Sequence, residues 1–456
     1  MSDAHIPKTL STVDQTGNRI WVYPKAIKGR FTLSRQWVSY ALMVFYFGVP
    51  WLKINGLPAF QLDVTDRRFI ILGQIFFPQD VKYLVFVLVA AAIAMFFFTA
   101  LAGRLWCGWA CPQTVFLEFV FRKIENLIEG DRNQRLALDN APWGLKKIGK
   151  KGFKHILFLI FASLTANTFL AYFVGIDNIL KWITQPPSEH WGAFLFMMFN
   201  LVIFYFDFAW FREQFCTLVC PYARFQSALA DENTFQVSYD ERRGEPRGKV
   251  GKTEGDCVNC SLCVQVCPTG IDIRNGLQLE CIGCARCIDA CDSIMDKVKR
   301  PRGLIRYDSE ARMEGKTNKI IRPRILIYAG ILMVMIAGLI WSVSHRPLVE
   351  FTVIRNPGEP YSVLAGNTVS NHLTLRLINK DRQDHQIIVR LEEPEEAQLI
   401  VPIQPYPLFQ NSTQRLDVFV NVPQRLLENG KLPITLYLDS DGQQVGKMDI
   451  RLLGPQ

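Results

Sequence analysis

The sequence predicts a multi-domain membrane protein: an α-helical transmembrane bundle of about five spans, an inserted cysteine-rich module and a C-terminal all-β sandwich. Three observations support this fold class. Hydrophobic residues make up 49% of the 456 residues and gather in long runs, which is typical of membrane helices. Eight of the twelve cysteines crowd into residues 257–291. After residue 346, polar and apolar residues alternate between turn signals, which indicates β-strands.

Five apolar segments approach the ~20 residues that a helix needs to cross a bilayer. They are residues 37–55, 83–105, 155–175, 191–211 and 325–343. A further apolar stretch at 69–77 is too short to span, and we expect it to lie in the membrane interface.

Basic residues predict the orientation of these spans, because Lys and Arg accumulate in cytoplasmic connections. They are frequent in the tail (1–36) and in the segments 104–154 and 212–324, whereas Lys181 is the only one between 176 and 190. We therefore expect the tail and both segments in the cytoplasm and residues 346–456 on the opposite side. Since topology explains the basic residues, we expect no nucleic-acid partner. The predicted domains are 1–36, 37–211, 212–324 with a module core at 255–292, 325–343 and 346–456.

The eight crowded cysteines form two runs of one pattern. The first is Cys257-x2-Cys260-x2-Cys263-x3-Cys267-Pro268, and the second is Cys281-x2-Cys284-x2-Cys287-x3-Cys291. Bacterial two-cluster ferredoxins have this spacing, and the fourth cysteine of each run binds the other cluster. We therefore assign one 4Fe-4S cluster to Cys257, Cys260, Cys263 and Cys291, and the other to Cys281, Cys284, Cys287 and Cys267. Zinc knuckles also use C-x2-C, but not four cysteines twice in so compressed an order. Asp292 stands where the ferredoxin pattern commonly has proline.

The other four cysteines form two matched pairs at the ends of predicted spans. Cys107 and Cys111 lie in RLWCGWACPQTVF, and Cys216 and Cys220 lie in REQFCTLVCPYARF. Each C-x3-C-P closes a helical hairpin, so two parallel copies would bring the pairs to one membrane depth. We expect each proline to open a helix at its first position, where the helix dipole lowers the pKa of a cysteine.

Several roles remain open for these four residues, which we call the edge cysteines. They could be buried structural residues, a redox dithiol, or ligands of Cu(I), zinc or an iron–sulfur cluster, all of which prefer thiolates. Asp207, inside the fourth span, is a functional candidate by default, although pairing with Arg212 would also explain it.

The C-terminal region predicts an immunoglobulin-like sandwich. About seven short strands over ~100 residues fit that architecture. The Cys…Trp…Cys spacing of antibody domains is absent from the sequence. The clearest strands are FTVI (351–354), HLTLRLI (372–378), QIIVRLE (386–392), RLDVFVNV (415–422), ITLYL (434–438) and KMDIRLL (447–453).

The order of these parts resembles the cytochrome c oxidase accessory protein family (CcoG, also called FixG or RdxA) over nearly the whole chain. The membrane half, with its C-x3-C-P pairs, is also similar to NapH-type quinol dehydrogenase subunits, which lack the C-terminal domain. The first resemblance implies a bacterial inner-membrane protein that reduces Cu(II) to Cu(I) for assembly of cbb3-type cytochrome oxidase. Its cofactors would be two 4Fe-4S clusters, with copper as a further metal.

The same resemblance implies roles for residues and partners. Cys107, Cys111, Cys216 and Cys220 would bind or reduce the copper. The implied partners are a cytoplasmic electron donor and either an oxidase subunit or a copper chaperone or transporter. Two alternatives remain: a quinol-linked electron-transfer subunit, or a scaffold whose sandwich docks on an oxidase subunit or copper chaperone.

Overall fold

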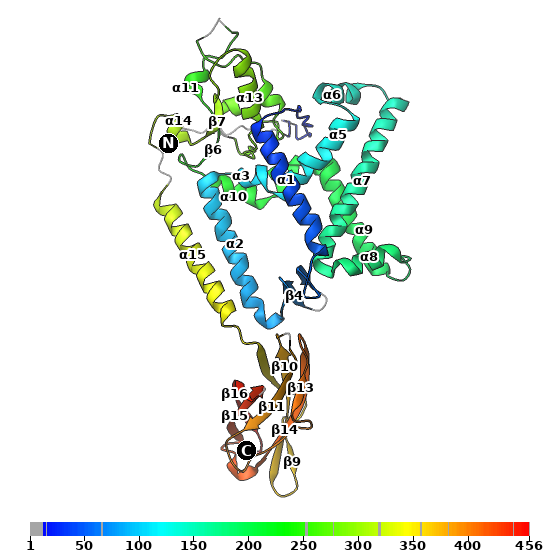
Figure 1. Cartoon of the computed structure of the whole chain (residues 1–456), viewed down its shortest axis with the longest axis vertical. Coiled ribbons are helices and arrows are strands. Elements are labelled where there is room, and N and C mark those ends of the chain that lie inside the picture. The colour runs from blue at the N-terminus through cyan, green and yellow to red at the C-terminus, as the bar shows by residue number, and fades with distance from the viewer. Residues whose placement is uncertain are drawn as a thin grey trace. The chain divides into compact units, whose positions relative to one another are not determined.

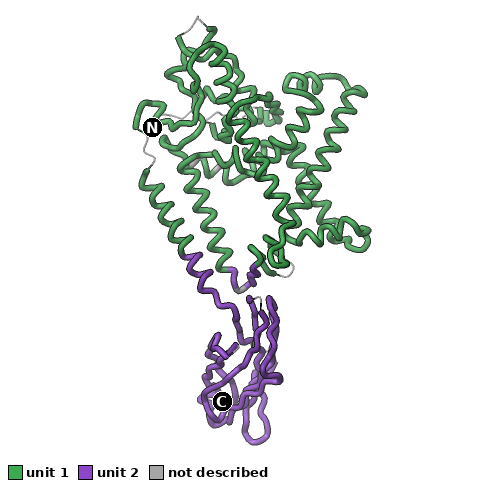
Figure 2. Tube along the Cα trace, viewed as in Figure 1, with its two compact units in different colours: residues 1–73, 82–337 green, residues 74–81, 338–456 purple. Residues whose placement is uncertain are grey.

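The computed structural model describes residues 12–14, 16–64, 67–250, 254–276, 278–317, 321–355, 358–381, 383–440 and 442–455. Residues 1–11 of the predicted tail therefore lie outside the described part. The chain divides into two compact units, coloured separately in Figure 2: residues 1–73 with 82–337, and residues 74–81 with 338–456. The second unit thus combines the segment before one membrane helix with the C-terminal domain.

Long apolar helices dominate the first unit (Figure 1). Among the described residues, four helices are long and apolar enough to span a membrane. They are α2 (Val81–Ala102), α7 (Leu145–Val174), α9 (Trp191–Phe206) with its π-helical continuation η4 (Asp207–Phe211), and α15 (Pro323–Ser344). These helices confirm four of the five predicted spans and make the chain a membrane protein.

The first predicted span, 37–55, is wrong in its bounds. Helix α1 covers Arg30–Gly48, and the 3-10 turn after it (η1, Val49–Trp51) contains Pro50. Proline cannot donate the amide hydrogen bond that would continue the helix. Arg30 and Arg35 make α1 more polar than the other four helices, and it does not meet the same length and hydropathy criterion. Its 19 residues extend about 28 Å, and it packs against α7 and the ferredoxin-like module.

The stretch 69–77 forms short strands, and its place in the membrane interface stays a prediction. Strand β4 (Arg68–Ile71) pairs antiparallel with β3 (Phe60–Asp63) in the connection between α1 and α2. The remaining short elements of this connection are β1 (Lys53–Ile54), β2 (Leu57–Pro58), β5 (Gln74–Phe76) and η2 (Pro78–Asp80).

The segment 104–154 is a compact set of short helices. Aromatic packing holds it against the membrane helices, since the Phe121 ring stacks on Phe208 of η4 at 4.5 Å and meets Phe158 of α7 edge-on at 4.9 Å. The helices are α3 (Leu105–Trp109), α4 (Pro112–Phe116), the π-helix η3 (Leu117–Phe121), α5 (Arg122–Ile128) and α6 (Arg132–Asn140); α8 (Ile176–Thr184) joins α7 to α9.

The cysteine-rich module has its own small core. Strand β6 (Gln236–Tyr239) pairs antiparallel with β7 (Ile305–Asp308), and helices α12 (Leu262–Gln265) and α13 (Arg286–Lys297) follow the two cysteine loops. Ile288, Met295 and Leu304 are almost fully buried in this core. The other elements here are η5 (Phe215–Val219), α10 (Pro221–Leu229), α11 (Glu241–Gly244), η6 (Ile273–Asn275) and α14 (Glu310–Met313).

The C-terminal domain is a sandwich of two antiparallel sheets, as the sequence predicted. One sheet has the order β12-β14-β10-β8, with β9 also pairing with β10, and the other has the order β13-β11-β15-β16. Inward-facing Leu375, Val418 and Leu436 are fully buried between them. The strands are β8 (Val349–Arg355), β9 (Ser362–Leu364), β10 (Thr368–Asn379), β11 (His385–Leu391), β12 (Gln398–Ile400), β13 (Tyr406–Leu408), β14 (Thr413–Pro423), β15 (Lys431–Ser440) and β16 (Gln443–Leu453), with η7 (Gln424–Leu426) after β14.

Buried charges stabilise this second unit. The Lys380 ammonium, whose side chain is fully buried, lies 2.7 Å from both Asp80 and Glu350. Arg346 binds the other oxygen of Asp80 at 2.5 Å. Although burial alone would raise it, these two cations lower the pKa of Asp80. We call this group the Asp80 clamp, because it ties residue 80 to the sandwich.

Candidate electron-transfer centre

Two cavities in the cysteine-rich module match the two predicted ligand sets. Cys257, Cys260, Cys263 and Cys291 all line one cavity. Cys267, Cys281, Cys284 and Cys287 all line the other, where Cys263 also reaches the wall. The exchange of the fourth cysteine between runs therefore agrees with the geometry, and the assignment of individual ligands stays a prediction.

The two cysteine loops turn in the same way. Ser261 follows the second cysteine of the first run and Ala285 follows that of the second; both adopt left-handed backbone angles, with φ of 55° and 59°. Each turn starts a helix that carries the third cysteine inward. A repeated conformation that is uncommon for residues with a side chain indicates that both loops wrap the same kind of group.

The thiol chemistry of these cavities fits iron–sulfur clusters. Burial, followed by repulsion from neighbouring thiols, raises the pKa of Cys263, Cys281 and Cys291 to about 12 each. Iron ions would favour the thiolate forms that burial disfavours, because they bind thiolates and compensate their negative charge. Two sets of four neighbouring soft donors, most of them shielded from solvent, are what two such clusters require.

Asp292 has a structural role at the position where the ferredoxin pattern commonly has proline. Helix α13 runs on past Cys291 to Lys297, and a proline at 292 would remove a helical hydrogen bond. The Asp292 carboxylate instead accepts a hydrogen bond from the Gly303 amide at 3.0 Å. The departure from the common pattern therefore leaves the cluster cavity intact.

The edge cysteines begin helices, as their prolines predicted. Cys111 and Cys220 have nearly the same extended backbone, with φ of −64° in each case, and Pro112 and Pro221 open helices α4 and α10. The two halves also interlock. The Arg104 guanidinium donates to Gln226 Oε1 at 2.8 Å, and the Cys107 thiol donates to the same oxygen at 3.4 Å.

The fold brings the four edge cysteines together. In each of the six possible pairs among Cys107, Cys111, Cys216 and Cys220, a thiolate on one residue would disfavour ionisation of the other, so the four side chains lie near one another. Burial is the main cause of a pKa of about 11 for Cys107 and of a raised pKa for Cys111. The expected lowering of the thiol pKa by a helix N-terminus is thus wrong for Cys111. The amides of Gln113 and Thr114 do favour its thiolate, but burial outweighs them.

Cys107 and Gly108 of the first edge motif lie directly against the second cysteine loop of the module. A Cβ atom on Gly108 would come within 2.5 Å of the Ile282 carbonyl oxygen and 3.0 Å of the Cys284 backbone. Cys107, Ile282 and Cys284 form one buried cluster. Only a glycine between Cys107 and Cys111 allows so close an approach, so the sequence of this motif itself sets the contact.

Further hydrogen bonds hold this contact in register. The Tyr307 hydroxyl donates to the Gly283 carbonyl at 2.6 Å and accepts from the Trp109 indole at 3.0 Å. The Arg35 guanidinium donates to the Gly108 carbonyl at 2.8 Å. Strand β7 and helices α1 and α3 thereby fix the same few residues.

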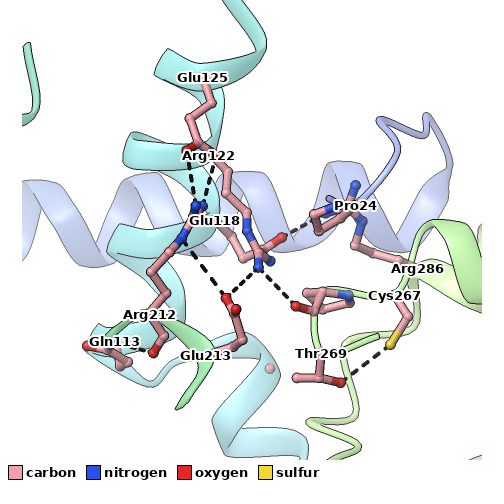
Figure 3. Close-up of polar contacts among 12 residues, drawn as sticks. Pro24, Gln113, Glu118, Arg122, Glu125, Arg212, Glu213, Cys267, Thr269 and Arg286 are labelled. Carbon is pink, nitrogen blue, oxygen red and sulfur yellow. Dashed lines mark hydrogen bonds and ion pairs between the residues drawn. The ribbon is translucent and has the colours of Figure 1, made fainter. Parts of the chain in front are cut away.

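A buried network of charges connects the module to the short helices of segment 104–154 (Figure 3). Arg286, beside Cys287, binds Glu118 at 2.7 Å, and Arg122 donates to the Pro268 carbonyl at 2.9 Å. Burial alone would raise the pKa of Glu118, but Arg122 and Arg286 hold it at about 2. The network fixes the second ligand set on both sides, at Cys267-Pro268 and at Arg286-Cys287. Its further members are Glu125, Arg135, Arg212 and Glu213.

Asp207 does not pair with Arg212 through their side chains. Gln113, which follows Cys111-Pro112, donates to Asp207 Oδ1 at 3.1 Å and to the Arg212 carbonyl at 3.2 Å. The Arg212 guanidinium binds Glu125 instead. Asp207 therefore links the two halves of the repeat.

Sequence reasoning missed most residues around the thiols. These residues meet only in the folded chain, and no sequence motif marks them as functional: Arg104, Gly108, Gln226 and Tyr307. A signal did exist for Gly108, since a glycine inside a short helix usually marks a close approach. Within the described residues, no three Cys, His, Asp or Glu side chains converge closely enough to hold a single metal ion.

Comparisons with known proteins agree with this architecture. A model described as a 4Fe-4S dicluster domain matches residues 211–310, one described as a 4Fe-4S binding domain matches 84–150, and one described as the IG-like fold at the C-terminus of FixG matches 339–455. With its membrane helices, the chain is therefore a membrane-bound iron–sulfur electron-transfer protein.

Whole-chain relatives identify the family. Proteins RdxB and RdxA of Cereibacter sphaeroides are 37% and 36% identical, over 85% and 88% of this chain and 84% and 89% of their own. Nitrogen fixation protein FixG of Rhizobium meliloti is 33% identical, over 85% of both chains. The chain belongs to this FixG/RdxA family. Ferredoxin-type protein NapH of Haemophilus influenzae is 24% identical over 42% of this chain and 56% of its own.

Proposed function

We propose that this protein is a cupric reductase that supplies Cu(I) for assembly of cbb3-type cytochrome oxidase. One observation carries the proposal: four neighbouring soft donors include Cys107, which packs against the second loop of a two-cluster electron-transfer module. Such a module supplies single electrons, and reducing one Cu(II) ion to Cu(I) consumes one electron. Thiolates also prefer the product Cu(I).

The chain's own residues would set the order of transfer. Cys260, in the first ligand set, is exposed, so a cytoplasmic donor would deliver electrons there. The second ligand set contacts Gly108 and would pass them to the edge cysteines. On this proposal the module faces the cytoplasm and the sandwich faces the periplasm.

A four-cysteine variant tests this function. Chemically reduced protein should convert Cu(II) to Cu(I), measured with a Cu(I)-specific chelator. Changing Cys107, Cys111, Cys216 and Cys220 to alanine should abolish the reaction while the spectrum of the 257–291 module stays. Thr217→Ala, which alters the second motif without removing a thiol, is the matched control. Full activity in the four-cysteine variant would refute the mechanism.

A quinol-linked role is the second candidate, and a cavity favours it. A cavity of about 600 Å³, almost wholly apolar, lies beside the first edge pair. Its volume is within the range of small-molecule sites. Trp106, Ala110 and Pro112 from the cysteine motif line one side, and Tyr46 and Tyr172 line another. A lipid-soluble carrier would fit such walls better than a hydrated copper ion.

Filling the cavity would separate the two functions. Ala110→Phe should block reduction of the protein by a quinol analogue and leave reduction by dithionite unchanged. If the wild-type protein shows no response to quinol, this candidate is rejected and the copper proposal is unaffected.

The sandwich is the part that we propose to bind an oxidase subunit or a copper chaperone. Ile403 and Phe409 are 58% and 55% exposed there, so apolar side chains are available on its surface for a protein partner. Deleting residues 346–456 should leave the electron-transfer spectrum intact and stop oxidase assembly. Normal assembly by the truncated protein would exclude this docking role.

A further inference from the structure

We propose that Cys107, Cys111, Cys216 and Cys220 hold a third 4Fe-4S cluster, next to the second cluster of the ferredoxin-like module. The inference rests on the proposed role of the edge cysteines as the site from which electrons leave, and it identifies the metal centre at that site. Copper would then receive its electron from an iron–sulfur centre.

The spacing of the thiols favours a cluster over a single ion. A tetrahedral ion with metal–sulfur bonds of about 2.3 Å needs its sulfurs about 3.8 Å apart. No three ligand side chains in the described ranges converge to that extent. The two ferredoxin-like sets are spread in the same manner, and they belong to a matched 4Fe-4S dicluster domain. Thiols that surround a cubane stand further apart, because each binds a different iron.

The edge set also resembles a ferredoxin-like set in how closely its thiols lie. Within the edge set, and within the set formed by Cys267, Cys281, Cys284 and Cys287, a thiolate on any one residue would disfavour ionisation of the others, which requires short separations. Arg104 would favour the thiolates of Cys107, Cys216 and Cys281, so this half-buried cation lies near both sets.

A family model supplies independent support. The 4Fe-4S binding domain matches residues 84–150, and within that range the sequence has only Cys107 and Cys111. A cluster of this type takes four thiolates, so two ligands must come from elsewhere. The fold brings Cys216 and Cys220 to this place from the second copy of the same motif.

A buried amide side chain lies beside the thiols. Gln226 is fully buried, and its Oε1 accepts from both Arg104 and Cys107. Its amide also interacts with the Tyr222 hydroxyl. The side chain would thus lie beside the sulfur atoms of a cluster, and hydrogen bonds to cluster sulfur are a known means of setting its potential.

Iron counting tests the proposal. Full-length protein would be purified anaerobically, reconstituted with iron and sulfide, and analysed for iron, acid-labile sulfide, copper and zinc per chain. Wild-type protein should hold about twelve irons. The variant Cys107→Ser/Cys216→Ser, which removes one ligand from each pair, should lose about a third of them and keep the electron paramagnetic resonance signals of the module. Thr217→Ala should keep all twelve.

Two further readouts guard against a folding artefact. About eight irons in the wild-type protein would overturn the proposal without any variant. Gln226→Leu should keep the iron content and shift the reduction potential of one cluster only; an unchanged set of potentials would also overturn it. Twelve irons without copper reduction would uphold the third cluster and reject the cupric reductase, and eight irons with copper reduction would do the reverse.

Discussion

Gly108→Ala offers the sharpest test of how the edge cysteines meet the module. The added Cβ would lie 2.5 Å from the Ile282 carbonyl, and ordinary contact begins at 3.4 Å, so the two backbones must separate by about 0.9 Å. Both sides of the contact are backbone, which cannot rotate away. Overpacking of this kind costs about 1–3 kcal/mol. The docked form should therefore become about 5- to 150-fold less favoured against a locally open form.

Hydrogen–deuterium exchange would measure this change directly. Amides of residues 281–287 should exchange faster in Gly108→Ala by that factor, and electrons should pass more slowly from the module to the edge site. Gly149→Ala is the matched control, because Gly149 is also helical and has no atom within 4 Å of the position that an added Cβ would take. Exchange and electron transfer equal to the wild type in Gly108→Ala would refute the claim that this glycine sets the contact.

Three other predictions address the charges and the clusters. Glu118→Gln should leave Arg286 without its carboxylate partner and Arg122 with Glu213 as its remaining partner, and it should cost about 3 kcal/mol, seen as earlier loss of the cluster spectrum on heating. Folding lowers the pKa of Asp80, so the stability that its carboxylate contributes is present above pH 3.8, the unfolded value, and is lost as the pH falls further. Asp80→Asn should abolish this loss of stability at acid pH, measured by proteolysis of the sandwich at a series of pH values. A pH profile identical to that of the wild type would contradict this prediction. Stripping the iron should loosen residues 257–298 in exchange experiments and leave the cysteine-free sandwich protected; equal loosening of both would count against separate units.

Local patterns predicted much of this protein. The cysteine spacings predicted two sets of four thiols that now line two cavities. All six clear strands of the sandwich are present, because runs of alternating or β-branched residues between turn signals are a strong indication of a strand. The short strands β9, β12 and β13 have only three residues each, too few for any alternation, and could not be identified.

The rest depended on long-range contacts. In the sequence, Arg122, Arg135 and Lys154 stand out only as charges that mark a cytoplasmic loop. In the fold they are buried and form ion pairs with Glu118, Glu125 and Glu129. The Arg122–Glu118 pair is local, at i and i+4, whereas Glu125 and Glu129 lie on other elements than Arg135 and Lys154 and meet them only in the tertiary structure. The direction of the Cys111 pKa shift was predicted wrongly for a related reason, since a motif does not show how deeply a thiol is buried.

The Asp80 clamp has a consequence for how the chain is made. Asp80 and Lys380 are 300 residues apart, which corresponds to about 15–60 s of synthesis at 5–20 residues per second. Helix α2 will thus have entered the membrane long before Lys380, whose ammonium pairs with the Asp80 carboxylate, has been synthesised. The Asp80 clamp therefore cannot form until synthesis has reached the sandwich.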